Sequence, residues 1–600
     1  MAQILFDQKR DFTGGLNFRA DQFQLRDNES PFILNMDVDP RGGAFTRAAY
    51  RKKHTTQVSG NWNPKGLFNY KDATSPRIML HTGKENSTDG KIYQSSGSNF
   101  TTLEYAVSTD VAVKSTNGAS ITQWLDTLYM AIGKDASQMY KWNQNNTYAV
   151  ALAASGPTWQ PYQVPTGGYM PRAEHVRAHA NKLFVANTKE LNNDATPSLI
   201  DHPNRLRWSH ENRPEDWFQD DYIDIIAGGE GITGLAIVDG QLLIFKPKAV
   251  YLLMGYDVDS FQLVELSTTV GIKYPQHVVE GSGGAYFFDY PAGLLFYNRN
   301  GIQDIFSRLK PTIDTNRINA NKLTDLTLSY VNDRVWMSAP FDFDPTTTSS
   351  TTNPTGTAVE YSNMNFIFDP SIGQSGAFTM YQSAIYQEAA TPVEITGYGL
   401  ISGCDWTDGN GEIWHLMIHP NDSFKYIMYV DEFEYSDDIP QNVMDDIPAG
   451  DELGNFQTVF VTPWFYDDRY VQDKTFVRSL YVVRPVDEIT EINVDVFHDF
   501  NTENKTTNHI INLEPVVTGG IWGTSIFYDP NDPNNPLTGI FGESDLKEGI
   551  QRGGRLKRAK SVQLKFEGPA AVTTSSANGR QWGLNSIAYK FKRRKVRSQK

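Results

Sequence analysis

Short apolar, aromatic-rich segments alternate with tight turns over most of the chain, and this pattern predicts β-hairpins. Six of the turns consist of Gly, Asn or Asp and lie directly before such a segment. They are at Asp126, Asn181, Asp239, Gly283, Asn332 and Gly409. These residue types accept positive φ, which hairpin turns require. Successive turns are between 44 and 77 residues apart, and each interval has room for about one four-stranded sheet.

This repeat predicts an all-β fold, namely a divergent β-propeller with additional β-sandwich-like domains and very little helix. A single helix candidate lies at about 311–323, where Pro311 suits a first helical turn. Alternating apolar and polar positions in 458–461, 479–483, 491–496, 561–566 and 585–589 predict half-buried strands. The C-terminal strands are therefore expected to form a sandwich.

Turn formers and local charge divide the chain into four predicted parts. Residues 1–60 are turn-rich and predict an N-terminal arm with docking strands. Residues 61–430 form the propeller, with an exposed polar insertion near 341–362. Residues 431–454 are acidic and interrupted by proline, which predicts a linker. Residues 455–600 form the sandwich-like domain and end in a basic tail.

The net charge of the chain limits how the protein could interact with DNA. The chain has 600 residues, 12% of them aromatic, and a formal net charge of −16. A surface with this net charge repels a polyanion, so tight DNA binding over the whole surface is not expected. If several copies surrounded a channel, an acidic wall would let DNA slide without sticking.

The charge reverses at the C-terminus, where basic side chains predict a docking segment. The candidate docking residues are Lys590, Lys592, Arg593, Arg594, Lys595 and Arg597. Three interpretations stay open: a solvated terminus, docking on an acidic partner, and docking on nucleic acid.

Motifs for catalysis and cofactor binding are missing from the sequence. The chain has no G-x-x-x-x-G-K-S/T loop, no H-E-x-x-H, no C-x-x-C and no strand-anchored G-x-S-x-G motif. We therefore expect no enzyme activity, no cofactor, no metal and no small-molecule substrate. The single cysteine, Cys404, is expected to be a buried thiol of a protein that folds in a reducing cytoplasm. No signal peptide or membrane span is expected.

Three further segments have residue types that could form a site. His175 and His179 lie four residues apart on a predicted strand, which favours structural roles. Residues 407–414 resemble the sialidase turn S-x-D-x-G-x-x-W, but Gly409 occupies the position of the Asp, so a hairpin with a packed Trp414 is expected. The oxygen-rich loop 529–536 lacks the Gly and Glu of a calcium hand. A carboxylate pair for glycoside hydrolysis stays open, because only the three-dimensional separation would identify it.

Several segments, taken in their order along the chain, resemble the tail nozzle, or packaged-DNA stabilisation, proteins of short-tailed bacteriophages (tail tubular protein B-like). They are Gly14-Gly15-Leu16-Asn17, the stretch from Asn35 to Arg47, Arg205-Leu206-Arg207-Trp208-Ser209, Pro214-Glu215-Asp216-Trp217, Gly231-Ile232-Thr233-Gly234-Leu235, Leu243-Ile244-Phe245-Lys246, Val250-Tyr251-Leu252-Leu253-Met254-Gly255 and Gly301-Ile302. The resemblance covers about residues 12–310 and is weaker beyond them.

The resemblance implies a structural virion protein that six copies assemble into a ring beneath the portal and adaptor. Such a homo-hexamer closes the portal-adaptor channel, retains packaged double-stranded DNA and conducts it during ejection without sequence-specific binding. The implied location is the virion tail, after assembly in the host cytoplasm, with the adaptor ring and tail fibre or tailspike proteins as partners. Arg205 and Arg207, beside Trp208 and Trp217, are candidate DNA contacts, although internal packing is the favoured interpretation.

Two other classes of protein remain alternatives. A receptor-binding or glycan-degrading tail protein would use a propeller to present aromatic side chains and carboxylates to a sugar. Such a protein is expected to form trimers, whereas a nozzle is expected to form sixfold rings. A soluble propeller interaction module of cellular origin is the third class, and the phage-like N-terminal half speaks against it.

Overall fold

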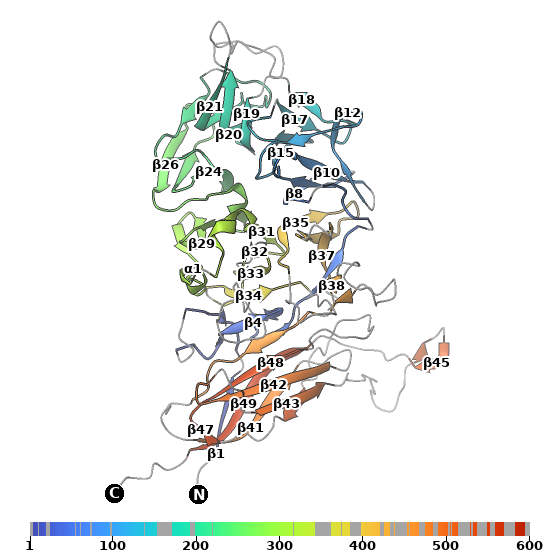
Figure 1. The fold of residues 1–600 in the computed structure, drawn as a ribbon, viewed down its shortest axis with the longest axis vertical. Coiled ribbons are helices and arrows are strands. Elements are labelled where there is room, and N and C mark those ends of the chain that lie inside the picture. Colours follow the sequence, from blue (N-terminus) through green and yellow to red (C-terminus); the bar gives the residue numbers. More distant parts are fainter. Residues whose placement is uncertain are drawn as a thin grey trace.

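The computed structural model describes most of the chain. It covers residues 4–593 apart from 10, 20–23, 55, 61, 73–74, 97–98, 137, 153–170, 192–197, 219, 316, 342–361, 374, 384–397, 421–424, 432–436, 439–452, 455, 467–473, 484–489, 502–504, 506, 514–527, 530–531, 537–548, 553–557 and 569–581. The molecule is elongated, with a ring of sheets at one end and a two-layered β-domain at the other (Figure 1).

In the described residues the ring consists of seven blades of four antiparallel strands each, which we call blades 1 to 7; blade 1 has an additional short strand, and blade 6 is part of a larger sheet. Blade 1 contains β8 (Pro64–Tyr70), β9 (Arg77–Thr82), β10 (Gly90–Ser96) and β11 (Asn99–Thr102). Blade 2 contains β15 (Ser120–Trp124), β16 (Thr127–Ala131), β17 (Met139–Trp142) and β18 (Val150–Leu152). Blade 3 contains β19 (Arg172–His179), β20 (Lys182–Leu191), β21 (Leu199–Trp208) and β22 (Tyr222–Asp224).

The remaining blades continue in chain order around the ring (Figure 1). Blade 4 contains β23 (Gly234–Val238), β24 (Gln241–Lys246), β25 (Ala249–Met254) and β26 (Gln262–Ser267). Blade 5 contains β27 (Val278–Gly281), β28 (Gly284–Asp289), β29 (Gly293–Asn298) and β30 (Gly301–Asp304). Blade 6 contains β31 (Thr327–Val331), β32 (Arg334–Ala339), β33 (Met364–Asp369) and β34 (Ala377–Tyr381). Blade 7 contains β35 (Ile401–Thr407), β36 (Ile413–Ile418), β37 (Ile427–Asp431) and β7 (Ala49–Lys52).

The predicted fold class is confirmed: the chain is all-β and contains a propeller. The six predicted turns join the first and second strands of blades 2 to 7. At these turns Asn181, Asp239 and Asn332 have positive φ, as hairpin geometry requires. The turn pattern did not predict blade 1, because the first two strands of this blade are joined by a longer connection, residues 71–76.

An N-terminal strand completes the ring. Strand β7 pairs antiparallel with β37, in register from Ala49 opposite Asp431 to Lys52 opposite Met428. The first and last segments of the propeller therefore share blade 7, and its backbone groups are satisfied by residues far apart in sequence.

The second domain is a β-sandwich whose first layer continues blade 6. From β34 the sheet runs through β4 (Phe32–Leu34), β40 (Val459–Val461), β48 (Val562–Glu567), β42 (Thr490–His498) and β43 (Thr507–Leu513). The second layer contains β46 (Gly549–Arg552), β41 (Lys474–Val483), β49 (Gly583–Arg593), β6 (Ala44–Thr46) and β5 (Met36–Val38), with β1 (Ile4–Lys9) on β49 and β47 (Arg558–Ala559) on β41. A core that includes Val494, Phe566, Tyr481 and Phe591 fills the space between the layers.

The shorter strands lie outside these layers. They are β2 (Gly15–Leu16), β3 (Glu29–Ser30), β12 (Glu104–Ala106), β13 (Thr109–Asp110), β38 (Asp437–Asp438), β39 (Leu453–Gly454), β44 (Tyr528–Asp529) and β45 (Asp532–Pro536). The short strand β14 (Ala112–Val113) pairs with β10 in blade 1. The predicted helix 311–323 is only partly helical. It corresponds to one turn, α1 (Pro311–Asp314), and a 3₁₀ segment, η2 (Ala320–Asp325); a second 3₁₀ turn, η1, spans Pro275–His277. Ile313, Ile318 and Leu323 are nevertheless buried.

The predicted N-terminal arm, residues 1–60, is not a separate arm. Its strands β1, β5 and β6 lie in the second sandwich layer, β4 lies in the shared sheet and β7 lies in blade 7. Pairing within the chain satisfies backbone groups that an arm would offer to a neighbour. Of the predicted insertion, 342–361 lies outside the described residues, as do 432–436 and 439–452 of the predicted linker.

A buried guanidinium joins the propeller to the sandwich. Only Arg47 and Ala48 separate sandwich strand β6 from propeller strand β7. Arg47 is 1% exposed and lies 3.9 Å from the ring centre of Tyr50 and 3.7 Å from that of Phe456. It donates to Asn35 Oδ1, to the carbonyl of Ala48 and to that of Gln382, at 2.9, 2.7 and 2.8 Å.

Asn35 extends the same network into both domains. Its side-chain oxygen also accepts the backbone N–H of Gln382 at the end of blade 6, and its amide donates to the carbonyl of Gln457 before β40. Asn35 is fully buried and has a φ of 53°, a conformation that asparagine tolerates better than most residues. We call Asn35 and Arg47, with these partners, the junction network.

Replacing Arg47 by Met is expected to destabilise both domains. The variant removes three hydrogen bonds at the junction, and leaving a buried acceptor without a donor costs roughly 1–3 kcal/mol. We expect a melting temperature several degrees below wild type and faster proteolytic separation of the two domains. The matched control is Arg41→Met, because Arg41 is 81% exposed and pairs with the neighbouring Asp39 carboxylate at the surface. Equal melting temperatures for the two variants would contradict the role of the junction network.

Candidate functional site

A cavity of about 240 Å³ lies at the centre of the propeller. The first strands of blades 1, 2, 3, 5, 6 and 7 contribute to its lining, including Gly66 of β8, Ile121 of β15, Arg177 of β19 and Leu328 of β31. At about 30 Å³ for each water molecule, the cavity holds roughly eight waters. A DNA duplex, whose major groove alone is about 12 Å wide, does not fit in such a space.

The polar groups of this cavity are mostly engaged with the protein. Lys65 lies 3.5 Å from the carbonyl of Thr324 and 3.9 Å from the Asp325 carboxylate. The amide of Gln276 donates to the same Thr324 carbonyl at 2.9 Å. Arg177 lies 3.6 Å from the Glu280 carboxylate. The cavity therefore combines paired charges of both signs and has no dominant charge that would select a ligand.

The cavity lining includes histidines. His81 and His175 line it, and burial lowers the pKa of each to about 4. His81 Nδ1 accepts the backbone N–H of Ala119 at 3.1 Å. His179, the other histidine of the predicted pair, packs its ring 5.7 Å from that of Phe184. These placements agree with the structural roles that the sequence favoured.

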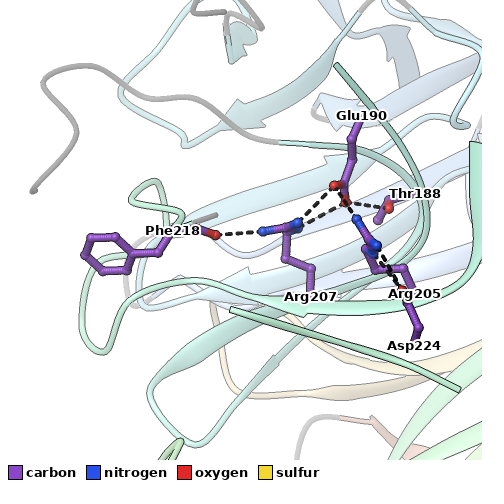
Figure 2. A network of polar contacts seen from close by, with 6 residues as sticks. All are labelled: Thr188, Glu190, Arg205, Arg207, Phe218 and Asp224. Carbon is purple, nitrogen blue, oxygen red and sulfur yellow. Dashed lines mark hydrogen bonds and ion pairs between the residues drawn. The ribbon is translucent and has the colours of Figure 1, made fainter. Parts of the chain in front are cut away.

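Arg205 and Arg207 lie inside blade 3, around one carboxylate (Figure 2). Arg207 donates from Nε and Nη2 to the two oxygens of Glu190, at 3.0 and 2.9 Å. Arg205 donates to Glu190 at 3.1 Å and, with two further bonds of 2.8 and 2.9 Å, to Asp224. Thr188 donates its hydroxyl to Glu190 at 2.7 Å.

The two central residues of this cluster are almost completely buried. The side chains of Arg207 and Glu190 are 2% and 4% exposed. Burial alone would raise the pKa of Glu190, but the charges of Arg207 and Arg205 outweigh it and hold that pKa below its usual range. The Arg205 guanidinium lies 3.7 Å from the ring centre of Tyr222. Both arginines are thus paired inside the protein and are not displayed to a DNA backbone, and the ring of Tyr222 lies beside both guanidinium groups.

The candidate docking residues fall on the last strand of the sandwich. Lys590 and Lys592 are half-buried side chains on β49. Arg593 ends this strand, while Arg594, Lys595 and Arg597 lie outside the described residues. The structure therefore fixes the backbone position of three of the six predicted residues.

The other sequence candidates are structural where they are described. Cys404 is half-buried on β35, and burial raises the pKa of its thiol to about 12. In the hairpin at 407–414, Asp408 caps the turn by accepting the N–H groups of Asn410 and Glu412. Trp414 packs against the core between blades 7 and 1. The loop 529–536 is described only in part.

The described part of the chain contains no candidate for a metal site or for a membrane-spanning helix. No three His, Cys, Asp or Glu side chains there come together as a metal site. Among the described helices, none has the length and apolar character needed to cross a membrane.

No protein-family model and no curated protein matches the chain. Among solved structures the chain is similar to the WD40 beta propeller domain of Doa1, at 8% identity and a TM-score of 0.31, covering 64% of this chain and 96% of that one. It is also similar to BBS1N in complex with ARL6DN, in crystals soaked with mercury or lead, at 8% and 10% identity, TM-scores of 0.33, and coverage of 64% of this chain and 97% and 98% of those. Similarities this small carry no functional argument.

Replacing Glu190 by Gln is expected to destabilise blade 3, because two buried guanidinium groups lose their shared charge. Breaking a buried ion pair from one side costs about 3–5 kcal/mol. Because the pKa of Glu190 is lower in the folded protein than in the unfolded chain, its ion pairs stabilise the fold fully above about pH 4.3, the pKa of Glu in the unfolded chain. This stabilisation is lost as the pH falls further. The melting temperature of Glu190→Gln should therefore be lower at pH 7 and should depend less on pH below 5 than that of wild type.

The control for Glu190 is Asp224→Asn, which removes the more exposed carboxylate of the same cluster. The Asp224 side chain is 36% exposed, so its loss is expected to cost less. A larger effect of Asp224→Asn than of Glu190→Gln would show that burial does not govern the cluster.

His277 is expected to make the propeller labile to acid. It is 1% exposed, and burial lowers its pKa to about 4. Below about pH 6.5 the unfolded chain takes up a proton that folded His277 does not, so stability falls from pH 6.5 toward 4. His277→Gln should flatten the fall of melting temperature with acidity, whereas substitution of the exposed His210 by Gln should preserve the wild-type curve. Parallel curves for all three proteins would refute this assignment.

Proposed function

We propose that the protein is a structural component of a short-tailed bacteriophage virion, the hexameric tail nozzle that closes the portal-adaptor channel and conducts DNA during ejection. The observation that carries this proposal is the ordered set of segments that resemble nozzle proteins, together with the places those segments occupy. Several of them lie at contacts that hold the fold together, which is compatible with a scaffold protein.

Three of these segments illustrate the point. The stretch from Asn35 to Arg47 contains both residues of the junction network. The segment Arg205–Ser209 supplies the two arginines of the buried cluster in blade 3. Gly15 has a φ of 64°, and a Cβ there would come within 2.9 Å of the carbonyl of Phe378, so a larger residue would push blade 6 away.

The DNA path of the proposed nozzle runs between copies and not through one propeller. The cavity inside a single propeller is too small for a duplex. A ring of copies would enclose a separate channel, and the net charge of −16 on each copy would keep that channel weakly adhesive for DNA. The adaptor ring, tail fibres or tailspikes and the passing DNA are the proposed partners.

Electron microscopy of the purified protein, alone and with its adaptor ring, tests this proposal. We expect sixfold rings with an open centre, at least when the adaptor is present, and a central opening wider than a DNA duplex. Trimers or monomers in both conditions would contradict the nozzle and favour the receptor-binding or glycan-degrading alternative. A cellular interaction module would show neither a ring nor binding to the adaptor.

A further inference from the structure

A second pocket, of about 340 Å³, lies between blades 7 and 1, where β35 and β8 are side by side (Figure 1). We call it the turn pocket, because turns of both blades border it. Blade 1 contributes Arg77 of β9 and Phe100 of β11, and blade 7 contributes Trp406 of β35 and Lys53, which follows β7. Its volume is at the lower end of the range for small-molecule sites, about 300–1,000 Å³.

The connections that reach the turn pocket are the longest of their kind. In blades 2 to 6 two residues join the first strand to the second, whereas residues 408–412 join them in blade 7 and residues 71–76 join them in blade 1. Gly409 and Ser75 of these two connections line the pocket. A hairpin needs only a two-residue turn, and longer loops on a rigid scaffold are the usual place for binding residues.

Arg77 supplies a guanidinium that has no anionic partner in the described part of the chain. It donates from Nη1 to the side-chain oxygen of Gln94 at 2.8 Å, and it lies 5.6 Å from the ring centre of Trp142. Its other N–H groups make no hydrogen bond to a described residue. A guanidinium in this state can donate two parallel hydrogen bonds to a carboxylate.

Lys53 adds a second cation to the lining. Its ammonium lies 2.8 Å from the ring centre of Trp414 and 5.2 Å from that of Trp406, and it makes no ion pair with a described residue. Burial lowers the pKa of Lys53 to about 8, so the amine is still protonated at neutral pH. Burial lowers the pKa of the adjacent His54 to about 4, so that side chain is neutral. The charged side chains of the lining are therefore the two cations, Arg77 and Lys53.

The carboxylates nearest to this pocket stand outside its lining. Asp408 and Glu412 attract Lys53 from the turn between β35 and β36, but neither forms an ion pair with it. The Asp408 carboxylate instead accepts two backbone N–H groups of its own turn and the indole N–H of Trp414. Asp72 accepts a backbone N–H in the connection between β8 and β9. The turn pocket thus keeps a net positive lining next to acidic side chains that are engaged elsewhere or lie farther away.

Aromatic rings and hydroxyl groups make up much of the remaining wall. Phe100 and Trp406 are half-buried, and both pack on the hydrophobic core between blades 7 and 1. The side chains of Ser75, Ser95 and Ser96 line the same space. Rings, hydroxyls and cations together complement a ligand that has an apolar face, several hydroxyl groups and a negative charge.

We propose that the turn pocket binds an acidic sugar, with the carboxylate on Arg77 and Lys53 and the ring on the aromatic wall. A carboxylate forms charge-assisted hydrogen bonds with a guanidinium and an ammonium. The C–H face of a sugar ring leaves water when it packs on an aromatic side chain. The net charge of −16 repels a nucleic acid more strongly than a sugar with one carboxylate. This binding activity would add to the proposed nozzle function and does not depend on it.

Saturation-transfer difference NMR on the full-length protein tests the proposal with D-glucuronate as the probe. We expect saturable binding with a dissociation constant of about 1 mM, the range for a ligand of about 13 non-hydrogen atoms. D-glucose has the same ring and lacks the carboxylate. It should bind about tenfold more weakly or less, because the charge-assisted hydrogen bonds are lost.

Two variants locate the binding. Arg77→Met should weaken glucuronate binding about tenfold or more and leave the weak binding of glucose unchanged. Its matched control is Arg299→Met, which changes the net charge equally at a turn of blade 5, where the Arg299 side chain is 80% exposed; this variant should bind like wild type. Ser96→Trp fills the turn pocket while both cations stay in place, and it should abolish the binding of both sugars.

Equal binding of glucuronate and glucose, no binding of glucuronate, or wild-type binding in Arg77→Met and Ser96→Trp would overturn the proposal. So would AMP that binds more tightly than glucuronate and displaces it, because the pocket would then be a nucleotide site. Glucuronate binding by a protein that forms no sixfold ring would refute the nozzle and leave the sugar site standing. Sixfold rings without glucuronate binding would refute the sugar site and leave the nozzle standing.

Discussion

The structure depends on one buried cation, the guanidinium of Arg47. It occupies the two-residue link between a strand of the sandwich and a strand of the propeller, and it is enclosed by two aromatic rings and three oxygen acceptors. A buried charge of this kind is tolerated only when its hydrogen bonds are complete. Those bonds can form together only when the N-terminal strands, blade 6 and the start of the sandwich are already in place.

The same region joins the two domains through the backbone. Blade 6 continues through β4 into the sandwich, and β7 completes blade 7. Both connections pair residues that lie several hundred positions apart. Because non-local pairing slows folding, we expect the ring to close late, after the central blades have formed from their local hairpins.

The sequence predicted the hairpins, which depend on local turn residues. It did not predict the strand pairings between residues that are far apart in the chain. Turn residues such as Asn181 and Asp239 mark hairpins by their own φ preference, so the propeller could be predicted. The first blade, joined by a longer connection, and the distribution of residues 1–60 among four sheets could not be predicted. Pairing partners such as Asp431 for Ala49 leave no local signal. At the candidate site, the internal role of Arg205 and Arg207 was foreseen, but their shared partner Glu190 and the ring of Tyr222 were not, since neither stands at a recognisable spacing.

The continuity of blade 6 with the sandwich has a mechanical meaning. A pull on the sandwich can reach the ring by two routes: along the peptide backbone through Arg47 and Ala48, and across the hydrogen bonds that join β34, β4 and β40. Because these routes act in parallel, neither carries the whole load. Torque and tension are then shared by the ring and the sandwich. Under force the two domains move as one rigid body and not as two independent domains.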